Sequence, residues 1–111
     1  MNWIPLENEQ SLDQLVAASA NTPQVIFKHS TRCSISTVAK GRLEKAAAPS
    51  GVAFYYLDLL KYRPVSNEIA SRFGVVHQSP QVLVISNGRC VYAESHLDIE
   101  MDAIAGSLQL S

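Results

Sequence analysis

Cysteine is scarce in this sequence, which has only Cys33 and Cys90 among its 111 residues. Two thiols are too few for a disulfide-stabilised scaffold and too few for a zinc site built from four thiolates. Long apolar runs are also lacking, since none approaches the roughly 20 residues of a membrane-spanning helix. Residues 1–10 lack the basic start and apolar stretch of a signal peptide. We therefore expect a cytoplasmic protein in which each cysteine needs its own explanation.

Charge of either sign is sparse as well. Charged residues make up 17% of the chain, hydrophobic residues make up 47%, and the formal net charge is -1. There is no basic excess to neutralise a phosphate backbone or an anionic lipid surface, so neither nucleic acid nor a membrane is an expected partner. The apolar content argues against disorder, and the length suits one core. We expect a single domain over residues 1–111.

Hydrophobic periodicity predicts the order of helices and strands. The run Val25-Ile26-Phe27 is typical of a strand that is buried on both faces, which implies helices on both sides of a sheet. Asn87-Gly88 between two strand-like runs is a strong signal for an antiparallel hairpin. The predicted helices are 11–20, 34–48, 64–73 and 99–108, and the predicted strands are 24–28, 52–58, 81–86 and 89–95.

This order of elements leaves few topologies, because a β-α-β unit is joined through a helix to a hairpin and a closing helix. One of them is the thioredoxin-like α/β fold, and this is the fold class that we expect. It has a central mixed four-stranded sheet flanked by helices, here with an extra N-terminal helix. Capping residues predict where two of the helices begin: Ser11 with Gln14 for the first helix, and Asp98 for the last.

Cys33 stands where a predicted buried strand has ended and a helix begins. Unpaired backbone N–H groups and the helix dipole favour an anion at such a place, and helix N-termini beside basic residues are where reactive thiolates occur. Residues 28–45 carry five basic residues against Glu44 alone, a balance of +4 in a chain that is otherwise -5. We therefore predict that Cys33 is a nucleophile. The alternative is the small buried hydrophobe that most free cysteines are.

The run Cys33-Ser34-Ile35-Ser36 has the spacing of a redox C-x-x-C motif, but serine occupies the second cysteine position. A serine hydroxyl cannot resolve a mixed disulfide, so the reaction should stop at that stage until another thiol attacks. Cys90 is a poor candidate for that thiol, because about 23 Å of strand separates it from Cys33 in this topology. A disulfide needs a far shorter separation. We interpret Cys90 as structural, or at most as an intermolecular oxidation site.

A proline and two histidines are predicted to lie at the same sheet edge as Cys33. Ser79-Pro80 directly precedes the third predicted strand, where a cis peptide or an ordinary trans strand start would both fit. His77 is close to this proline in the sequence, and His96 follows the fourth strand, so both could meet an anionic ligand. The spacing of the histidines and Cys33 is poor for zinc, and we expect no metal.

Four segments carry a resemblance to a known family: FKHSTRCSIS (27–36), GVVHQSPQ (74–81), NGRCVY (87–92) and SH (95–96). Together they resemble the monothiol bacilliredoxins of the YtxJ type, redox proteins of the bacterial bacillithiol system. The resemblance implies a thioredoxin-like fold and the removal of bacillithiol from mixed disulfides on cytoplasmic proteins. It implies that Cys33 attacks and that Pro80 is a cis-proline. Family members commonly have proline where this chain has Ser34, so we expect tuned reactivity rather than lost function.

The mechanism that the resemblance implies needs a thiol co-substrate, bacillithiol, and no bound cofactor. The Cys33 thiolate, in the basic surroundings of Lys28 and Arg32, would attack a bacillithiolated protein and keep the bacillithiol. A second bacillithiol or a bacillithiol-system reductase would then regenerate it. Bacillithiol carries malate carboxylates, which makes Arg32, His96 and the start of the last helix reasonable contacts. The other expected substrate-binding residues are Ser34, Ser36, Ser79 and His77.

Two other classes of function stay open. A glutaredoxin-like protein can use a C-x-x-S site to hold an iron–sulfur cluster between subunits, although the glycine that usually follows the active cysteine in such proteins is absent here. A noncatalytic adaptor with a thioredoxin fold would show no thiol exchange at Cys33.

Overall fold

The structure, a computed structural model, describes residues 1–108. In chain order its elements are β1 (Trp3–Pro5), α1 (Glu9–Ala18), β2 (Gln24–His29), α2 (Ser34–Lys45), β3 (Ala53–Asp58), α3 (Arg63–Phe73), β4 (Gln81–Ser86), β5 (Arg89–Ser95), the 3-10 helix η1 (His96–Asp98) and α4 (Met101–Leu108). The strands of the described residues form one mixed sheet in the order β1-β3-β2-β4-β5. The strands β1, β3 and β2 are parallel, whereas β4 is antiparallel to β2, and β5 to β4.

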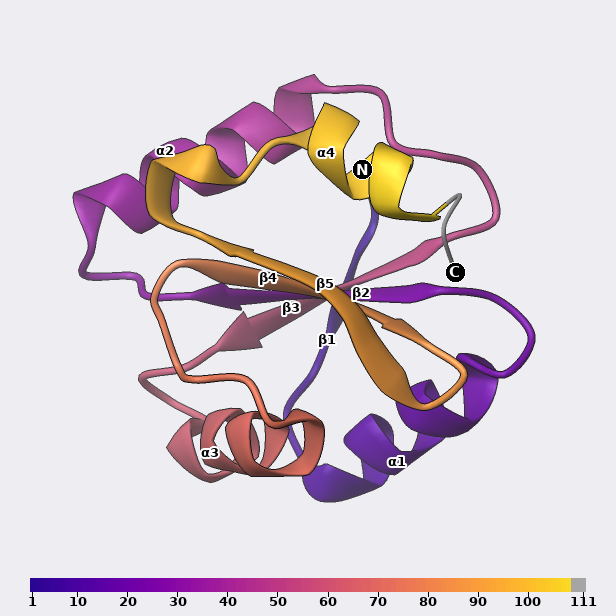
Figure 1. Cartoon of the computed structure of the whole chain (residues 1–111). Helices are drawn as coiled ribbons and strands as arrows, with labels where there is room; N and C mark the ends of the chain where they lie inside the picture. Colours follow the sequence, from indigo (N-terminus) through magenta and orange to yellow (C-terminus); the bar gives the residue numbers. More distant parts are fainter. Residues whose placement is uncertain (109–111) are drawn as a thin grey trace.

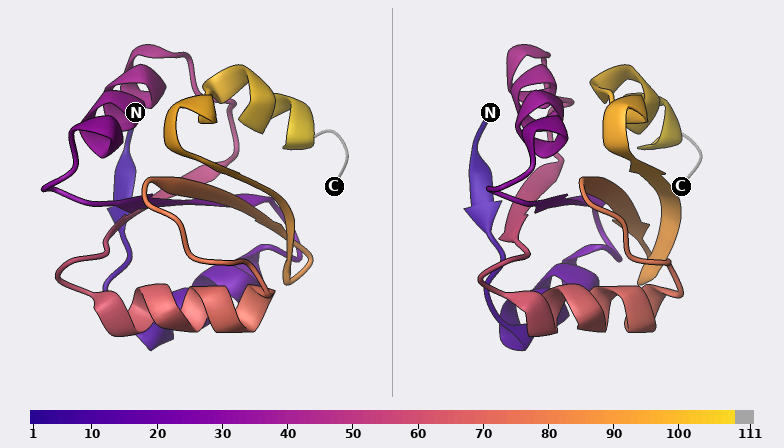
Figure 2. Two further views of the ribbon diagram at one scale, coloured as in Figure 1. Left: turned by 60° about the vertical axis from the view of Figure 1, so that its left-hand side comes forward. Right: turned by 90° about the vertical axis from the view of Figure 1, so that its left-hand side faces the viewer.

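Helices cover both faces of the sheet. Figures 1 and 2 show α2 and α4 on one face and α1 and α3 on the other. Every residue of the central strand β2 is buried, as the apolar run 25–27 predicted, and so is every residue of the central strand β4. Successive side chains of a strand point to opposite faces, so the chain builds two cores.

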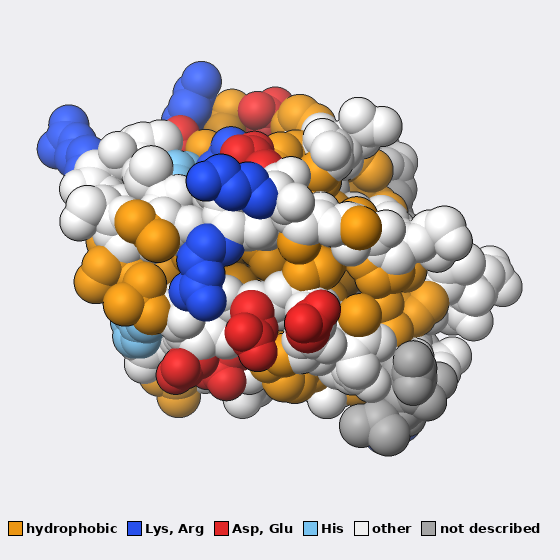
Figure 3. All heavy atoms as spheres, turned by 90° about the horizontal axis from the view of Figure 1, so that it is seen from above, with side chains coloured by type: hydrophobic (Ala, Val, Ile, Leu, Met, Phe, Trp, Pro, Cys, Tyr) orange, Lys and Arg blue, Asp and Glu red, His pale blue; other side chains and the backbone are white. Residues whose placement is uncertain are grey.

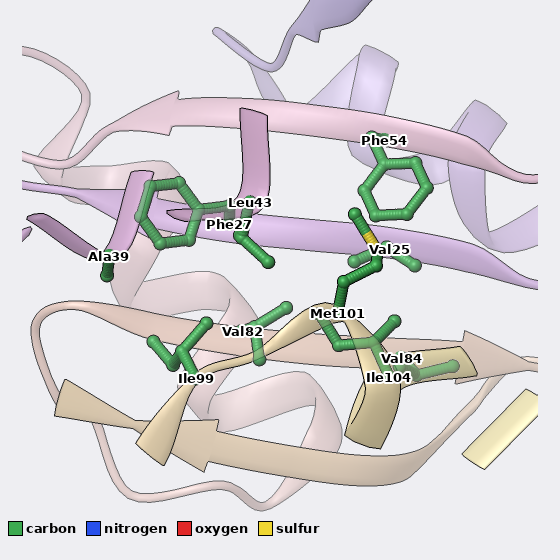
Figure 4. Close-up of a cluster of buried hydrophobic side chains, with 10 residues drawn as sticks. All are labelled: Val25, Phe27, Ala39, Leu43, Phe54, Val82, Val84, Ile99, Met101 and Ile104. Atoms are coloured by element: carbon green, nitrogen blue, oxygen red, sulfur yellow. The ribbon is translucent and has the colours of Figure 1, made fainter. Parts of the chain in front are cut away.

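The core between the sheet and the α2 and α4 layer is shown in Figure 4. It contains Val25, Phe27, Ala39, Leu43, Phe54, Val82, Val84, Ile99, Met101 and Ile104. The core on the α1 and α3 side contains Leu6, Leu12, Leu15, Ile26, Leu57, Val65, Ile69, Leu83 and Ile85. Together the two layers hold the central strands rigidly, and this rigid centre positions the loops at the ends of the strands.

Among the described residues the sheet has five strands instead of the four that the sequence predicted, because no sequence pattern indicated the edge strand β1. This strand is only three residues long, too short for a periodic pattern, and it pairs in parallel with β3. Its Trp3 ring packs 5.6 Å from the ring of Phe27 and 6.3 Å from that of Phe54. The indole Nε1 also donates a hydrogen bond of 2.8 Å to Glu44 in α2. Tertiary contacts rather than local pattern therefore define β1.

Two predicted helix starts are wrong. Asn8, not Ser11, is the N-cap of α1, and its side-chain oxygen accepts a 2.8 Å hydrogen bond from the Ser11 backbone N–H. Asparagine is at least as good a cap as serine, so the helix begins earlier. Asp98 lies inside η1, because the Ile99 backbone N–H donates to the His96 carbonyl and closes a 3-10 turn before α4.

The predicted hairpin between β4 and β5 is confirmed, and it docks on the end of α1. Asn87 and Gly88 have φ angles of 53° and 76°, as a tight two-residue turn requires. The Asn87 N–H donates to the Ser19 carbonyl at 2.8 Å, and the Gly88 N–H donates to the Ser19 hydroxyl at 2.9 Å. This single serine therefore holds the turn that sets the register of both strands.

We predict that Ser19→Ala lowers the free energy of unfolding by about 1–3 kcal/mol, because it leaves the Gly88 N–H without its partner in a partly buried place. The measurement is urea unfolding followed by circular dichroism. Ser50→Ala, a change at an exposed serine in a loop, serves as the matched control and should leave the midpoint unchanged. Equal midpoints for the two variants would contradict this role of Ser19.

Candidate active site

Four chain segments meet at one edge of the sheet, the left-hand edge in Figure 1. β2 and β3 end there, β4 begins there, and β5 returns there. Lys28 in β2 pairs with Gln81 in β4, and Gln81 pairs with Ser95 in β5. The loops that carry Cys33, Pro80 and His96 therefore leave neighbouring strands at the same level of the sheet.

Cys33 is the N-cap residue of α2. Its backbone is extended, with φ −108° and ψ 119°, and its carbonyl accepts a 3.1 Å hydrogen bond from the Thr37 N–H. The thiol is half-exposed, makes no capping hydrogen bond of its own, and meets no acidic side chain in the first turn of the helix. The positive end of the helix dipole thus faces a sulfur that solvent can reach, a favourable place for a thiolate.

Ser36, at the second cysteine position of the motif, is fully buried. Its hydroxyl accepts a 3.0 Å hydrogen bond from the Ser30 backbone N–H and pairs with Nδ1 of His29 at 2.6 Å. The Ser30 carbonyl in turn accepts a 3.2 Å hydrogen bond from the Cys33 N–H. Ser36 thus ties down the loop of Cys33 and has no surface for a substrate, which corrects its predicted binding role.

The sequence reasoning missed His29, because it ended the predicted strand at residue 28. His29 is the last residue of β2 and is buried, with its ring stacked on Phe27 at 5.8 Å and close to Tyr56 at 5.4 Å. Burial, followed by the charge of Lys40, lowers the pKa of His29. A neutral imidazole is therefore favoured beside the Ser36 hydroxyl. The available signal was the strand periodicity, which turns this histidine toward the face that α2 covers.

The peptide bond between Ser79 and Pro80 is cis. Pro80 is buried, and its carbonyl accepts a 3.0 Å hydrogen bond from the His96 N–H. The hydroxyl of Ser79 is buried and has no hydrogen-bond partner among the described residues. The loop before β4 and the end of β5 are therefore joined at Pro80.

His96 occupies an unusual backbone conformation beside that proline. Its φ is 59°, which is uncommon for a residue other than glycine, and its side chain is exposed. The next carbonyl, that of Leu97, accepts a 2.8 Å hydrogen bond from Arg42 in α2. A left-handed residue held from two sides is typical of a functional loop.

The remaining predicted residues divide between the surface and the interior. Arg32 and Ser34, the two neighbours of Cys33, are exposed. Lys28 is fully buried, and its Nζ donates to the Ser66 carbonyl in α3, on the face of the sheet opposite α2. It therefore does not join Arg32 as the basic surroundings of the thiol, which corrects that expectation. His77 is half-buried and reaches Lys28, with Nδ1 3.3 Å from Nζ.

Cys90 lies at the far end of the sheet from this site, opposite Ile85 in β4. Its Sγ donates a 3.3 Å hydrogen bond to the Tyr92 carbonyl, and burial raises the pKa of this thiol. Burial, the largest effect, favours the protonated form. The structure does not bring the two cysteines together.

The surface around Cys33 combines apolar and basic side chains. Figure 3, which looks onto α2 and α4, shows hydrophobic side chains at the left-hand edge, where the loops lie, and basic side chains beside them. Ile35 in the first turn of α2 and Leu97 in η1 are 40% and 52% exposed. Among residues 1–108, no three His, Cys, Asp or Glu side chains cluster as metal ligands. No helix in that range is long and apolar enough to span a membrane.

Solved structures with the same fold are numerous. A structure described as a thioredoxin-fold oxidoreductase is 30% identical and covers 94% of this chain and 91% of its own, with a TM-score of 0.82. Mitochondrial thioredoxin 3 of Saccharomyces cerevisiae is 16% identical over 98% of this chain and 95% of its own, with a TM-score of 0.75. The thioredoxin of Malassezia sympodialis is 14% identical over 98% and 90%, also with a TM-score of 0.75. The thioredoxin-like fold expected from the sequence is confirmed.

The sequence also matches a family model, that of the monothiol bacilliredoxin BrxC, over residues 4–104. This match spans β1 to α4 and includes Cys33, Ser36 and Pro80. The chain therefore belongs to the monothiol bacilliredoxin family.

Proposed function

We propose that this protein is a monothiol oxidoreductase that removes bacillithiol from mixed disulfides on cytoplasmic proteins. One observation carries the proposal: a half-exposed Cys33 caps α2, while the second position of its motif is a fully buried serine. A reactive thiol with no partner thiol beside it is suited to taking one thiol group and holding it. Membership of the monothiol bacilliredoxin family supports bacillithiol as that group.

The proposed reaction has two exchange steps. The Cys33 thiolate attacks the bacillithiol sulfur of the mixed disulfide, the S–S bond breaks, and the client cysteine leaves as a thiolate that takes up a proton. A thiolate from a second bacillithiol then attacks the bacillithiol sulfur on Cys33, which releases bacillithiol disulfide and restores Cys33. Overall, one mixed disulfide and one bacillithiol thiol give one client thiol and one bacillithiol disulfide. A reductase of the bacillithiol system could replace the second thiol in the last step.

The ligand in this proposal is an anion, because bacillithiol carries two malate carboxylates. Arg32 is exposed next to Cys33, and His96 is exposed where β5 meets the loop of Pro80. Arg42 is less available, since it already donates to the Leu97 carbonyl. We therefore assign carboxylate binding to Arg32 and His96, with Ser34 beside the sulfur and the cis-proline Pro80 facing the incoming disulfide.

Cys33→Ser should abolish the transfer, because a hydroxyl is not a nucleophile toward a disulfide at neutral pH. A bacillithiolated protein is incubated with each variant, and intact-mass spectrometry follows both chains. The wild type and Cys90→Ser should gain one bacillithiol at Cys33 as the client loses one. Transfer at the wild-type rate by Cys33→Ser would rule out this function and would leave a noncatalytic adaptor as the better description.

Ser36→Cys should convert the one-thiol reaction into a two-thiol reaction. Residues three apart at a helix start share a face, so the introduced thiol can attack the adduct on Cys33, release bacillithiol and leave an intramolecular disulfide. Mass spectrometry would show the bacillithiol adduct replaced by the loss of two hydrogens. Ser36→Ala, which has no thiol, should keep the adduct. A stable adduct on Ser36→Cys would contradict the assigned geometry.

Arg32→Gln should raise KM for a bacillithiolated client by about two- to fivefold, because an exposed ion pair contributes at most about 1 kcal/mol. The value of kcat should change little, since the contact lies away from the reacting sulfurs. Added salt should shrink the difference from the wild type. Arg89→Gln, at an exposed arginine near the hairpin turn, is the matched control. The same KM for both variants would argue against carboxylate binding by Arg32.

A further inference from the structure

Lys28 is a buried lysine without a carboxylate partner. The side chain is fully buried, and within residues 1–108 no Asp or Glu lies at ion-pair distance from it. Its Nζ donates to the Ser66 carbonyl in α3 at 3.1 Å and contacts Nδ1 of His77 at 3.3 Å. An isolated buried ammonium is costly, so this arrangement needs a reason other than stability.

The partner of Lys28 belongs to the segment that leads into the cis-proline. Residues 74–80, between α3 and β4, form no helix or strand. They are tied to the body of the protein at a few points. Gln81 Nε2 donates to the Val76 carbonyl at 3.0 Å, the Gln78 N–H donates to Gln81 Oε1 at 3.4 Å, and His77 reaches Lys28. Of these, the His77 contact is the tie to β2, and Nδ1 of His77 also lies 3.4 Å from the Ser66 hydroxyl in α3.

The protonation states of the pair fit this tie. Burial, followed by the charge of Arg63, lowers the pKa of Lys28 to about 8, so the amine is still mainly protonated at pH 7 and acts as the donor. Burial, followed by the charges of Lys28 and Arg63, lowers the pKa of His77. Its imidazole therefore stays neutral, accepts at Nδ1 and carries its proton on Nε2. The other close neighbours in the sheet, Leu57 and Gln81, are uncharged.

We propose that Lys28 and His77 are positioning residues, which hold the loop of residues 75–80 so that Pro80 and the exposed Val76 present a fixed edge to the client disulfide. This inference rests on the proposed function, because it assigns the pair to the protein-sized substrate of that reaction. Val76 is 79% exposed, and it is held from two sides, by Gln81 at its own carbonyl and by the Lys28 contact of its neighbour His77. This positioning role explains why a charged side chain is kept in the interior at residue 28.

The loop can be released without touching Cys33 by Lys28→Met, which keeps the length of the side chain and removes the ammonium. Lys28→Met removes the desolvation cost of a buried ammonium but leaves the Ser66 carbonyl and Nδ1 of His77 without this donor, so the Tm at pH 7 should change little. In the wild type, unfolding lets Lys28 take up a proton between about pH 8 and its ordinary pKa of 10.5. Wild-type stability should therefore rise relative to Lys28→Met as the pH increases through that window.

The decisive comparison is between two reactions of the same thiol. With a bacillithiolated protein as substrate, Lys28→Met should lower kcat/KM by about ten- to hundredfold, the range expected for the loss of one hydrogen bond to a charged group. Alkylation of Cys33 by iodoacetamide, which needs no loop, should stay within about twofold of the wild type. Lys45→Met, at an exposed lysine in the last turn of α2, is the matched control and should change neither rate.

Two histidine variants and a spectrum separate positioning from a merely structural role. His77→Ala should lose as much transfer rate as Lys28→Met, and His77→Asn should recover most of it, because its amide oxygen lies where Nδ1 accepted the hydrogen bond. Nitrogen NMR of the His77 ring should show a proton on Nε2 in the wild type and a mixture of tautomers in Lys28→Met. Equal transfer rates for the wild type and Lys28→Met, or an unchanged tautomer, would overturn the inference alone. A wild type that transfers no bacillithiol would overturn the proposed function as well.

Discussion

The last two residues of β2 hold both loops of the candidate active site. Because side chains alternate along a strand, Lys28 and His29 leave the same strand end toward opposite faces of the sheet. His29 meets Ser36 under α2, and Lys28 meets His77 beside α3. The strand itself is buried on both sides and hydrogen-bonded on both edges. A rigid strand end thus fixes the loop of the thiol and the loop of the cis-proline relative to each other.

The serine in the C-x-x-S motif has a structural consequence as well as a chemical one. A cysteine at this position would supply a second thiol, whereas the Ser36 hydroxyl accepts the Ser30 N–H and pairs with His29. In place of a second thiol, this position has a hydroxyl that fixes the loop of Cys33. A buried hydroxyl that is fully hydrogen-bonded is stable where it stands, and the exposed sulfur keeps its access to solvent. The serine at this position therefore fixes the loop of the nucleophile and, under the proposed function, leaves the reaction dependent on an external thiol.

The two cysteines differ because their surroundings differ. Cys33 stands at a helix start without an acidic neighbour in the first turn. Cys90 stands in β5, where burial raises the pKa of the thiol and Sγ donates to a carbonyl. The hairpin that carries Cys90 is anchored to α1 through Ser19, far along the sheet from the loops of the site. The two thiols therefore lie at opposite ends of the sheet, Cys33 at the candidate active site and Cys90 near the hairpin turn.

Sequence alone determined the order of the four helices and of the four longer strands, the hairpin at Asn87-Gly88 and the place of Cys33 at a helix start, because these depend on local periodicity and turn chemistry. It also identified the family, since four short segments together are specific. Tertiary structure decided the rest. The strand β1 exists through its pairing with β3 and the contacts of Trp3. Ser36 contacts His29, and His77 contacts Lys28, so both residues face inward. The sequence did not predict this, because each partner lies across a loop or far away in the chain. No local pattern records which face a helix or loop covers.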